Sequence, residues 1–177
     1  MLLPFTGVSR RFFALIIGVE KYKFPLWLNL EGCVADADDI VAYVTRYLGV
    51  SDDHISVLNN EMATRANIIH HIQVLATDGR IAPNDPILIY YAGAVSIVQA
   101  PTPARTGWTD APTSLLHPYD FNPNPTTLSD NPSGISDKML NGLLANLATA
   151  KGNNIVRPSL ACALCMTSKH LLQDRNL

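Results

Sequence analysis

The amino-acid sequence predicts an α/β domain with a mostly parallel sheet and helices on both faces. Segments of strand length and helix length alternate through the first half of the 177-residue chain. The first strand segment is apolar throughout, as in a strand that is covered on both faces. Each helix segment carries one apolar stripe. Because strand–helix–strand units are joined by right-handed crossovers, the strands are expected to run parallel.

The first predicted strand is "FFALIIGV", from Phe12 to Val19. A helix is predicted to follow, with Asp36 as its N-cap and Gly49 as its C-terminal stop. Its apolar stripe consists of Ala37, Ile40, Val41, Val44 and Leu48. This spacing is typical of a helix that packs one face against a sheet.

A second strand is predicted from His54 to Asn60, and a third from Asp85 to Gly93. Between them Thr64 is the predicted N-cap of a helix. The apolar stripe of that helix is Ile68, Ile69, Ile72, Leu75 and Ala76. In open parallel sheets ligands bind beyond the carboxyl ends of the strands. The residues after the third strand are therefore expected at the edge where chemistry takes place.

The second half of the chain is less regular. Residues 99–132 are rich in proline, which indicates loops, with one short strand predicted from Ser114 to Asp120. A further helix is predicted from Asp137, its N-cap, to Ala150. The next sheet strand is expected in "NNIVRPSLACALC", but Pro158 cannot donate a hydrogen bond to a ladder. The sheet is thus predicted to be incomplete at its C-terminal side.

Composition excludes several classes of function. A net charge of −2 and a pI near 6.2 predict neither nucleic acid nor a membrane as partner. Three cysteines do not form a disulfide framework, and no apolar run has the length of a membrane span. The N-terminus lacks the pattern of a signal peptide. A cytoplasmic location is therefore expected.

Several segments resemble the caspase-like cysteine peptidases, and among them the metacaspase-like proteins of fungi and plants. The matching segments are "FALIIGVEKY", "LNLEGCVADADDI", "LGVSDDHISVLNNEMATRANI", "PILIYYAG", "HPYD", "GISDKMLNGLLANLA" and "AKGNNI". The resemblance implies a caspase-like three-layer α/β/α fold. It also divides the chain into a caspase-like domain (12–155), an N-terminal extension (1–11) and a divergent tail (156–177).

The family's chemistry requires a histidine at the tip of the third strand and a cysteine nucleophile at the end of the next strand. Ala94 occupies the histidine position, and Val95 replaces the glycine that follows it. Cys162 falls near the nucleophile position, but its surroundings differ from the family's motif. The resemblance further assigns Asp36 to a pocket for a basic substrate side chain, a role compatible with capping a helix. It implies no cofactor and no metal.

These observations predict a caspase-like or metacaspase-like peptidase domain that is catalytically inactive as written. A regulatory pseudoenzyme of this kind would bind an active caspase-like relative as its partner. Two alternatives stay open. One is an active cysteine endopeptidase that uses Cys162 to cleave peptide or protein substrates after Arg or Lys. The other is a truncated or mis-spliced gene product whose tail is out of register.

The remaining candidate residues have ordinary interpretations. The spacing of Cys162 and Cys165 is that of half a zinc site, but no second ligand pair accompanies it. None of the histidines is predicted at the tip of the third strand, and each is interpreted as a surface or strand-end residue: His54, His70, His71, His117 and His170.

Overall fold

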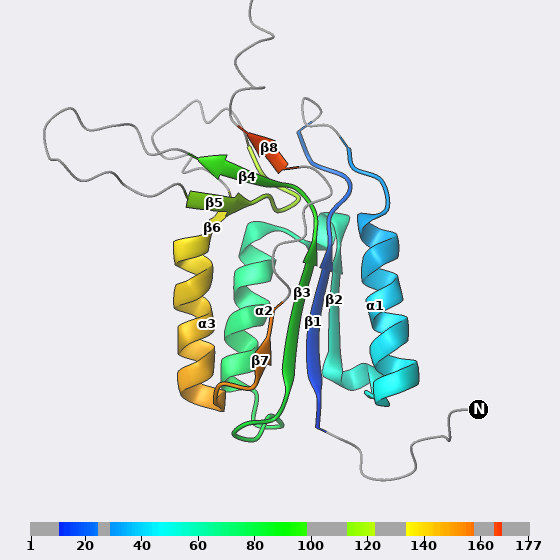
Figure 1. The fold of residues 1–177 in the computed structure, drawn as a ribbon, viewed down its shortest axis with the longest axis vertical. Coiled ribbons are helices and arrows are strands. Elements are labelled where there is room, and N and C mark those ends of the chain that lie inside the picture. The colour runs from blue at the N-terminus through cyan, green and yellow to red at the C-terminus, as the bar shows by residue number, and fades with distance from the viewer. Residues whose placement is uncertain (1–10, 25–28, 99–112, 123–133, 158–164, 168–177) are drawn as a thin grey trace, which may run out of the picture.

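The computed structural model describes residues 11–24, 29–98, 113–122, 134–157 and 165–167. Within these ranges the chain forms two four-stranded sheets (Figure 1). The first sheet has the order β2-β1-β3-β7, and all its strands are parallel. Its strands are β1 (Phe13–Gly18), β2 (Ile55–Asn59), β3 (Ile87–Ala92) and β7 (Ile155–Val156). The predicted α/β fold class is confirmed.

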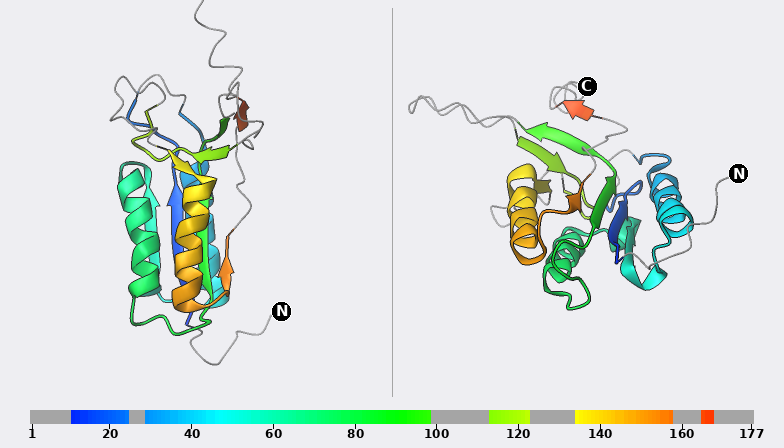
Figure 2. Two further views of the ribbon diagram at one scale, coloured as in Figure 1. Left: turned by 90° about the vertical axis from the view of Figure 1, so that its left-hand side faces the viewer. Right: turned by 60° about the horizontal axis from the view of Figure 1, so that its bottom comes forward.

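Helices cover both faces of the first sheet (Figure 2). One face carries α1 (Cys33–Leu48), and the other carries α2 (Arg65–Thr77) and α3 (Asp137–Lys151). Two short 3₁₀ turns, at Asp52–His54 and Asn60–Met62, flank β2.

The central strand β1 is buried along its whole length. Its side chains alternate between two apolar clusters. Leu15 and Ile17 pack on the side of α2 and α3, whereas Ala14 and Ile16 pack on the side of α1. The uninterrupted apolar run predicted from the sequence therefore follows from burial on both faces.

Two predicted helix starts are wrong, and in both cases another residue provides the start. The helix predicted to begin at Asp36 begins at Cys33, after Gly32 at φ 91°, so Asp36 lies in its first turn. The N-cap of α3 is Ser136, whose Oγ accepts a hydrogen bond from the Met139 N–H, and Asp137 is the first helical residue. The predicted cap Thr64 is confirmed.

The second sheet was not predicted from the sequence. It has the order β6-β5-β4-β8. Its strands are β4 (Val95–Val98), β5 (Thr113–Leu116), β6 (Ile135–Ser136) and β8 (Cys165–Thr167). The third predicted strand ends at Ala92, and the chain enters the second sheet three residues later. Strands of two to four residues are too short to show an alternating pattern.

Within the described residues the last strand of the first sheet, β7, is two residues long. The described part of β7 pairs with β3 at two positions, Ile87↔Ile155 and Leu88↔Val156. Pro158 itself lies outside the described residues.

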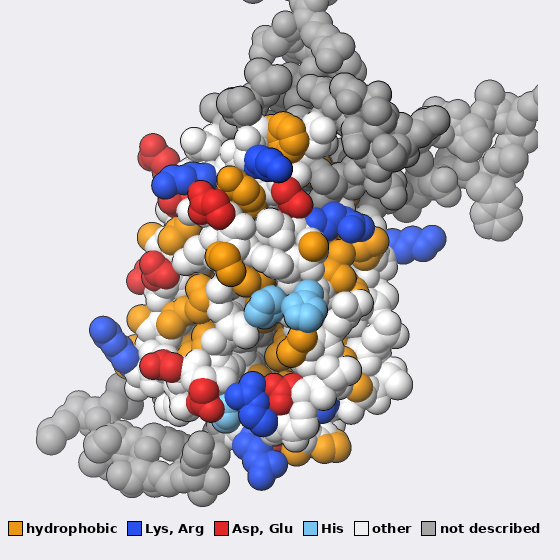
Figure 3. All heavy atoms as spheres, turned by 180° about the vertical axis from the view of Figure 1, so that it is seen from behind, with side chains coloured by type: hydrophobic (Ala, Val, Ile, Leu, Met, Phe, Trp, Pro, Cys, Tyr) orange, Lys and Arg blue, Asp and Glu red, His pale blue; other side chains and the backbone are white. Residues whose placement is uncertain are grey.

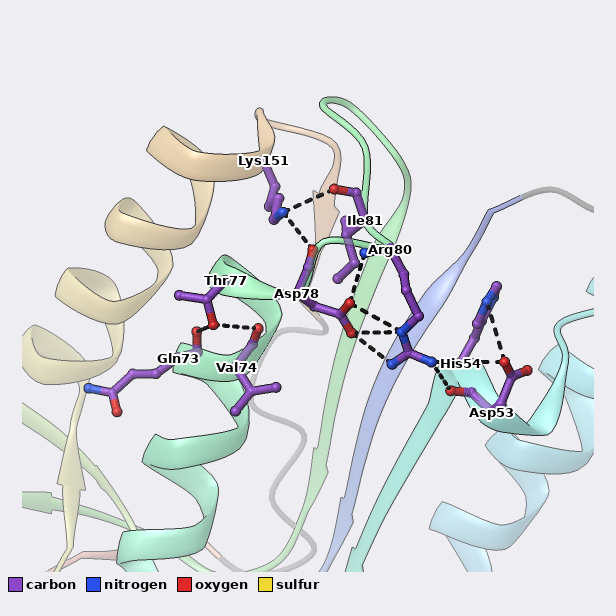
Figure 4. Close-up of polar contacts among 9 residues, drawn as sticks. All are labelled: Asp53, His54, Gln73, Val74, Thr77, Asp78, Arg80, Ile81 and Lys151. Atoms are coloured by element: carbon purple, nitrogen blue, oxygen red, sulfur yellow. Dashed lines mark hydrogen bonds and ion pairs between the residues drawn. The ribbon is translucent and has the colours of Figure 1, made fainter.

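Polar contacts join the elements at the end of the sheet where β1 begins (Figure 4). The guanidinium of Arg80 binds the Asp78 carboxylate at 2.7 Å and the Asp53 carbonyl at 3.0 Å. From α3, Lys151 Nζ donates to the carbonyls of Asp78 and Ile81. These bonds tie the ends of α2 and α3 to the loops between the strands. No helix in the described ranges is long and apolar enough to cross a membrane.

At the other end of β1, Gly18 permits the close approach of α1. A Cβ at this position would lie 2.9 Å from the Cys33 carbonyl oxygen, 2.9 Å from Asn59 Oδ1 and 3.0 Å from the Ala37 Cβ. Real Cβ atoms are rarely this close to backbone. Because Gly18 has no side chain, the start of α1 can lie directly against the carboxyl ends of β1 and β2.

We predict that Gly18→Ala lowers the free energy of unfolding by about 1–3 kcal/mol, because the added methyl group overpacks a filled site. Gly142→Ala is the matched control, since nothing lies within 4 Å of a Cβ at that helical position. It should raise the free energy of unfolding by about 0.5–1 kcal/mol. Urea denaturation measures both. Equal effects of the two changes would contradict the close approach at Gly18.

Candidate active site

The candidate site lies at the carboxyl edge of the first sheet, where the sequence predicts it. Gly18, the last residue of β1, pairs with Asn59 on one side and Ala92 on the other. The N-terminus of α1 lies at the same edge (Figure 1). Ala94 follows two residues after the end of β3 and is 5 % exposed.

Both main-chain polar groups of Ala94 are engaged within the protein. Its N–H donates to the Tyr22 hydroxyl at 2.9 Å. Its carbonyl accepts from the His117 N–H at 3.1 Å and lies 3.1 Å from the Tyr91 hydroxyl. The tip of β3 is therefore packed and hydrogen-bonded, and its backbone is not presented to a ligand.

Tyr91 fills the space beside this tip. Its hydroxyl donates to the carbonyl of His117 at 2.7 Å as well as approaching that of Ala94. A Cβ at Gly93 would come within 2.6 Å of the same hydroxyl oxygen, so any side chain there would require Tyr91 to move. Because Tyr22 and Tyr91 are both buried, their bonds to the β3 tip are shielded from water.

A histidine lies next to this tip, although not at the position of the missing base. His117 is fully buried, and its Nε2 shares a hydrogen bond of 2.8 Å with Ser96 Oγ. Its ring stacks on Phe121 with centroids 3.8 Å apart. Burial lowers the pKa of His117 to about 4, so the ring is neutral at neutral pH.

His117 was interpreted as a surface or strand-end residue; it lies at a strand end but is not at the surface. The residue does follow directly on the end of β5, but β5 packs against β4 and buries it. Its partner Ser96 lies on β4, diagonally across the strand pair. Since β4 was not predicted, no signal in the sequence joined these two residues. With so low a pKa and a bonded Nε2, His117 is poorly suited to act as a general base.

Asp36 lies at the same edge of the sheet, as the resemblance implies. Its side chain is exposed in the first turn of α1, where a carboxylate is favoured by the helix dipole. The pKa of the Tyr90 phenol is raised, first by burial and second by the negative charge of Asp36. The assignment of Asp36 to a substrate pocket stays a prediction.

Two further acids, Asp120 and Asp137, accept hydrogen bonds from the backbone. Asp120 Oδ1 accepts a hydrogen bond from the Arg65 N–H at 2.8 Å and so caps α2. Asp137 Oδ2 accepts from the Ser114 N–H at 3.3 Å, which joins α3 to β5. These contacts explain both residues without a catalytic role.

The nucleophile position, Cys162, lies outside the described residues. The backbone of the second cysteine of the pair is described: Cys165 begins β8 and pairs with Val95 of β4. The chain after the nucleophile position therefore returns to the residue next to Ala94. Nothing in the sequence pattern of the tail indicated this pairing.

A loop network that the sequence did not reveal supports the edge. Asn60, at a φ of 45°, accepts hydrogen bonds from the N–H groups of Glu20 and Lys21 through Oδ1. The Glu20 carboxylate in turn accepts from the Val34 N–H at 3.4 Å, in the first turn of α1. Asn60 and Glu20 thus join the first residues after β1 to the first turn of α1.

The part of the chain that is described shows no metal centre and no large patch of one charge on the face seen in Figure 3. No three His, Cys, Asp or Glu side chains in these ranges are grouped closely enough to hold a metal ion. The face shown in Figure 3 mixes acidic, basic and apolar side chains, and neither sign of charge predominates on it.

The architecture and the position of the site define a caspase-like α/β domain. Residues 13–149 match the family model described as metacaspase, peptidase C14 domain. The chain belongs to this family.

Curated relatives from fungi agree with this assignment. The chain is 35% identical to Metacaspase-1 of Saccharomyces cerevisiae over 86 residues, which are 45% of this chain and 19% of the relative. It is 31% identical to Metacaspase-1 of Meyerozyma guilliermondii over 99 residues, or 52% of this chain and 23% of the relative. The chain thus matches about a fifth of the length of these relatives.

A solved structure shows the same fold at lower sequence similarity. The crystal structure of protein GSU0716 from Geobacter sulfurreducens superposes with a TM-score of 0.59 and 20% identity. The match covers 82% of this chain and 47% of that one.

We predict that stability falls as the pH drops from about 6.5 to 4, because His117 resists protonation only in the folded state. Its pKa is about 4 when folded, against roughly 6.5 for an unfolded histidine. The unfolded chain therefore binds more protons in this window, and about 3 kcal/mol is lost by pH 4. Urea denaturation at a series of pH values measures the loss.

The variant His117→Gln should be less stable at pH 7 but should show a flatter pH profile. His70→Gln changes an exposed histidine and should keep the wild-type slope. A His117→Gln profile as steep as the wild type would rule out a neutral buried imidazole at this position.

Proposed function

We propose that this chain is a catalytically inactive metacaspase-type domain that acts as a partner of an active relative. The observation that carries this proposal is the state of Ala94, which occupies the position of the base. Its side chain cannot accept a proton, and its N–H and carbonyl are bonded to Tyr22, Tyr91 and His117.

Loss of the base removes the means to activate a thiol. Without a neighbouring base or positive charge, a cysteine keeps a pKa near 8.5, and little thiolate forms at neutral pH. The described residues offer no substitute at the tip of β3. The nearest histidine, His117, is neutral and hydrogen-bonded to Ser96.

The oxyanion-binding function of the strand tip is also impaired. A backbone N–H stabilises an oxyanion only if it points at the reacting carbonyl. The N–H of Ala94 instead donates to a buried phenol. Val95, which replaces the family's glycine, is 6 % exposed and is held in β4 by its pairing with Leu116.

The scaffold, in contrast, is preserved. The parallel sheet, the three helices and the exposed Asp36 at the site edge are all in place within the described residues. A domain that keeps its fold and loses its base retains the surfaces with which it contacts other proteins. This favours a role in binding, either to an active relative or to the basic segments that such a relative cleaves.

The chain should not hydrolyse fluorogenic peptides that carry Arg or Lys before the scissile bond. The measurement is fluorescence release at neutral pH, with an active member of the family as positive control. The variants Cys162→Ala and Cys165→Ala should be indistinguishable from the wild type. Turnover that disappears in Cys162→Ala would overturn the proposal in favour of an active endopeptidase.

In a mixture with an active relative, the chain should lower the rate of peptide hydrolysis in a saturable manner. A decoy that holds the basic side chain through Asp36 loses its effect in Asp36→Asn and at high substrate concentration. Asp39→Asn, another exposed acid of α1, is the matched control. An unchanged rate at every concentration of the chain would exclude both forms of the binding role.

A further inference from the structure

A cavity of about 590 Å³ lies between α2, α3 and one face of the first sheet. Its walls are mainly aliphatic. They include Ile68 and Ile72 from α2, Leu140 and Leu144 from α3, and Ile17 and Ile89 from β1 and β3. Its volume lies within the range of roughly 300–1,000 Å³ that is usual for small-molecule sites. No step of the proposed function uses this space.

A second hollow, at the surface, shares two lining residues with the cavity. This hollow, of about 290 Å³, lies along α3 and β7. Leu144 and Arg157 line both spaces. They therefore lie at the connection between the two spaces, whereas Ile17, Ile68 and Ile72 at the deep wall are at most 2 % exposed.

A positive charge lies at this connection. Arg157 is exposed, and its Nη1 donates to Asn141 Oδ1 at 3.1 Å. Asn141 is a neutral partner, and among the described residues no carboxylate is within ion-pair distance of Arg157. A guanidinium holds carboxylates through charge-assisted hydrogen bonds.

We propose that this cavity binds a long-chain aliphatic carboxylate, with the chain between α2 and α3 and the head group on Arg157. The aliphatic walls favour a hydrocarbon chain, and one guanidinium at the opening complements one negative charge. The walls consist of side chains from two helices and a sheet face, so they suit an alkyl chain better than a peptide, whose backbone needs partners. The cavity reaches Tyr91, beside the Ala94 edge, but binding in it does not depend on catalysis.

Displacement of a dansylated undecanoate from the purified chain tests the proposal. Palmitate should displace the fluorophore in a saturable way, at one ligand per chain and below its micellar concentration. Hexadecanol has the same hydrocarbon length without the carboxylate, and it should bind about tenfold more weakly. A loss of this size corresponds to one hydrogen bond with a charged group.

Two pairs of variants locate the site. Arg157→Gln should weaken palmitate about tenfold and leave hexadecanol unchanged, whereas Arg46→Gln, an exposed arginine of α1, should change neither. Leu144→Trp fills the connection and should abolish binding of both ligands. Leu143→Trp is the matched control, because the side chain of Leu143, the residue next to Leu144, lines neither space.

Thermal melts show whether each variant is folded. If Leu144→Trp does not fold, Arg157→Gln still decides the test. The proposal is overturned if the wild type shows no saturable displacement, or if hexadecanol competes as well as palmitate. Equal effects of Arg157→Gln and Arg46→Gln also overturn it, as do equal effects of the two tryptophan changes in folded protein. None of these readouts involves peptide hydrolysis, so they are independent of the test for inactivity.

Discussion

Burial of β1 on both faces is the constraint on which the rest of the structure depends. The strand pairs with β3 along its whole length and with β2 from Ala14 to Gly18, so its position fixes theirs. Its alternate side chains anchor α1 on one side and the α2–α3 layer on the other. The candidate site inherits its geometry from this arrangement, because Gly18, Asn59 and Ala92 end at one level and the loops that follow them converge.

The strands and helices of the first half were predictable because their signals are local and long. β1 and the stripes of α1 and α2 are continuous patterns, and they are present in the structure, although Leu48 at the end of the first stripe is 40% exposed. Helix starts were less predictable, since several residues compete to begin a helix. Gly32 precedes Asp36, and Ser136 precedes Asp137. The second sheet was missed because its short strands pair across long, proline-rich intervals.

The candidate site, too, was only partly predictable from the sequence. The place of Ala94 at the tip of β3 followed from one strand and from the resemblance to the metacaspases. The residues that occupy its surroundings did not. Tyr22 lies 72 positions from Ala94 in the chain, and the bond between Tyr91 and His117 spans 26 positions. Contacts between residues so far apart in the sequence arise from the packing of whole elements, and a local sequence pattern does not predict them.

The hydrogen bonds around Ala94 also bear on what a substitution at this position would cost. Its N–H is bonded to the Tyr22 hydroxyl, its carbonyl to the His117 N–H and the Tyr91 hydroxyl, and the residue is 5 % exposed. A larger side chain introduced here enters a packed region, and overpacking costs about 1–3 kcal/mol. Proteins are only marginally stable, so the chain bears that cost whatever chemistry the new side chain could perform.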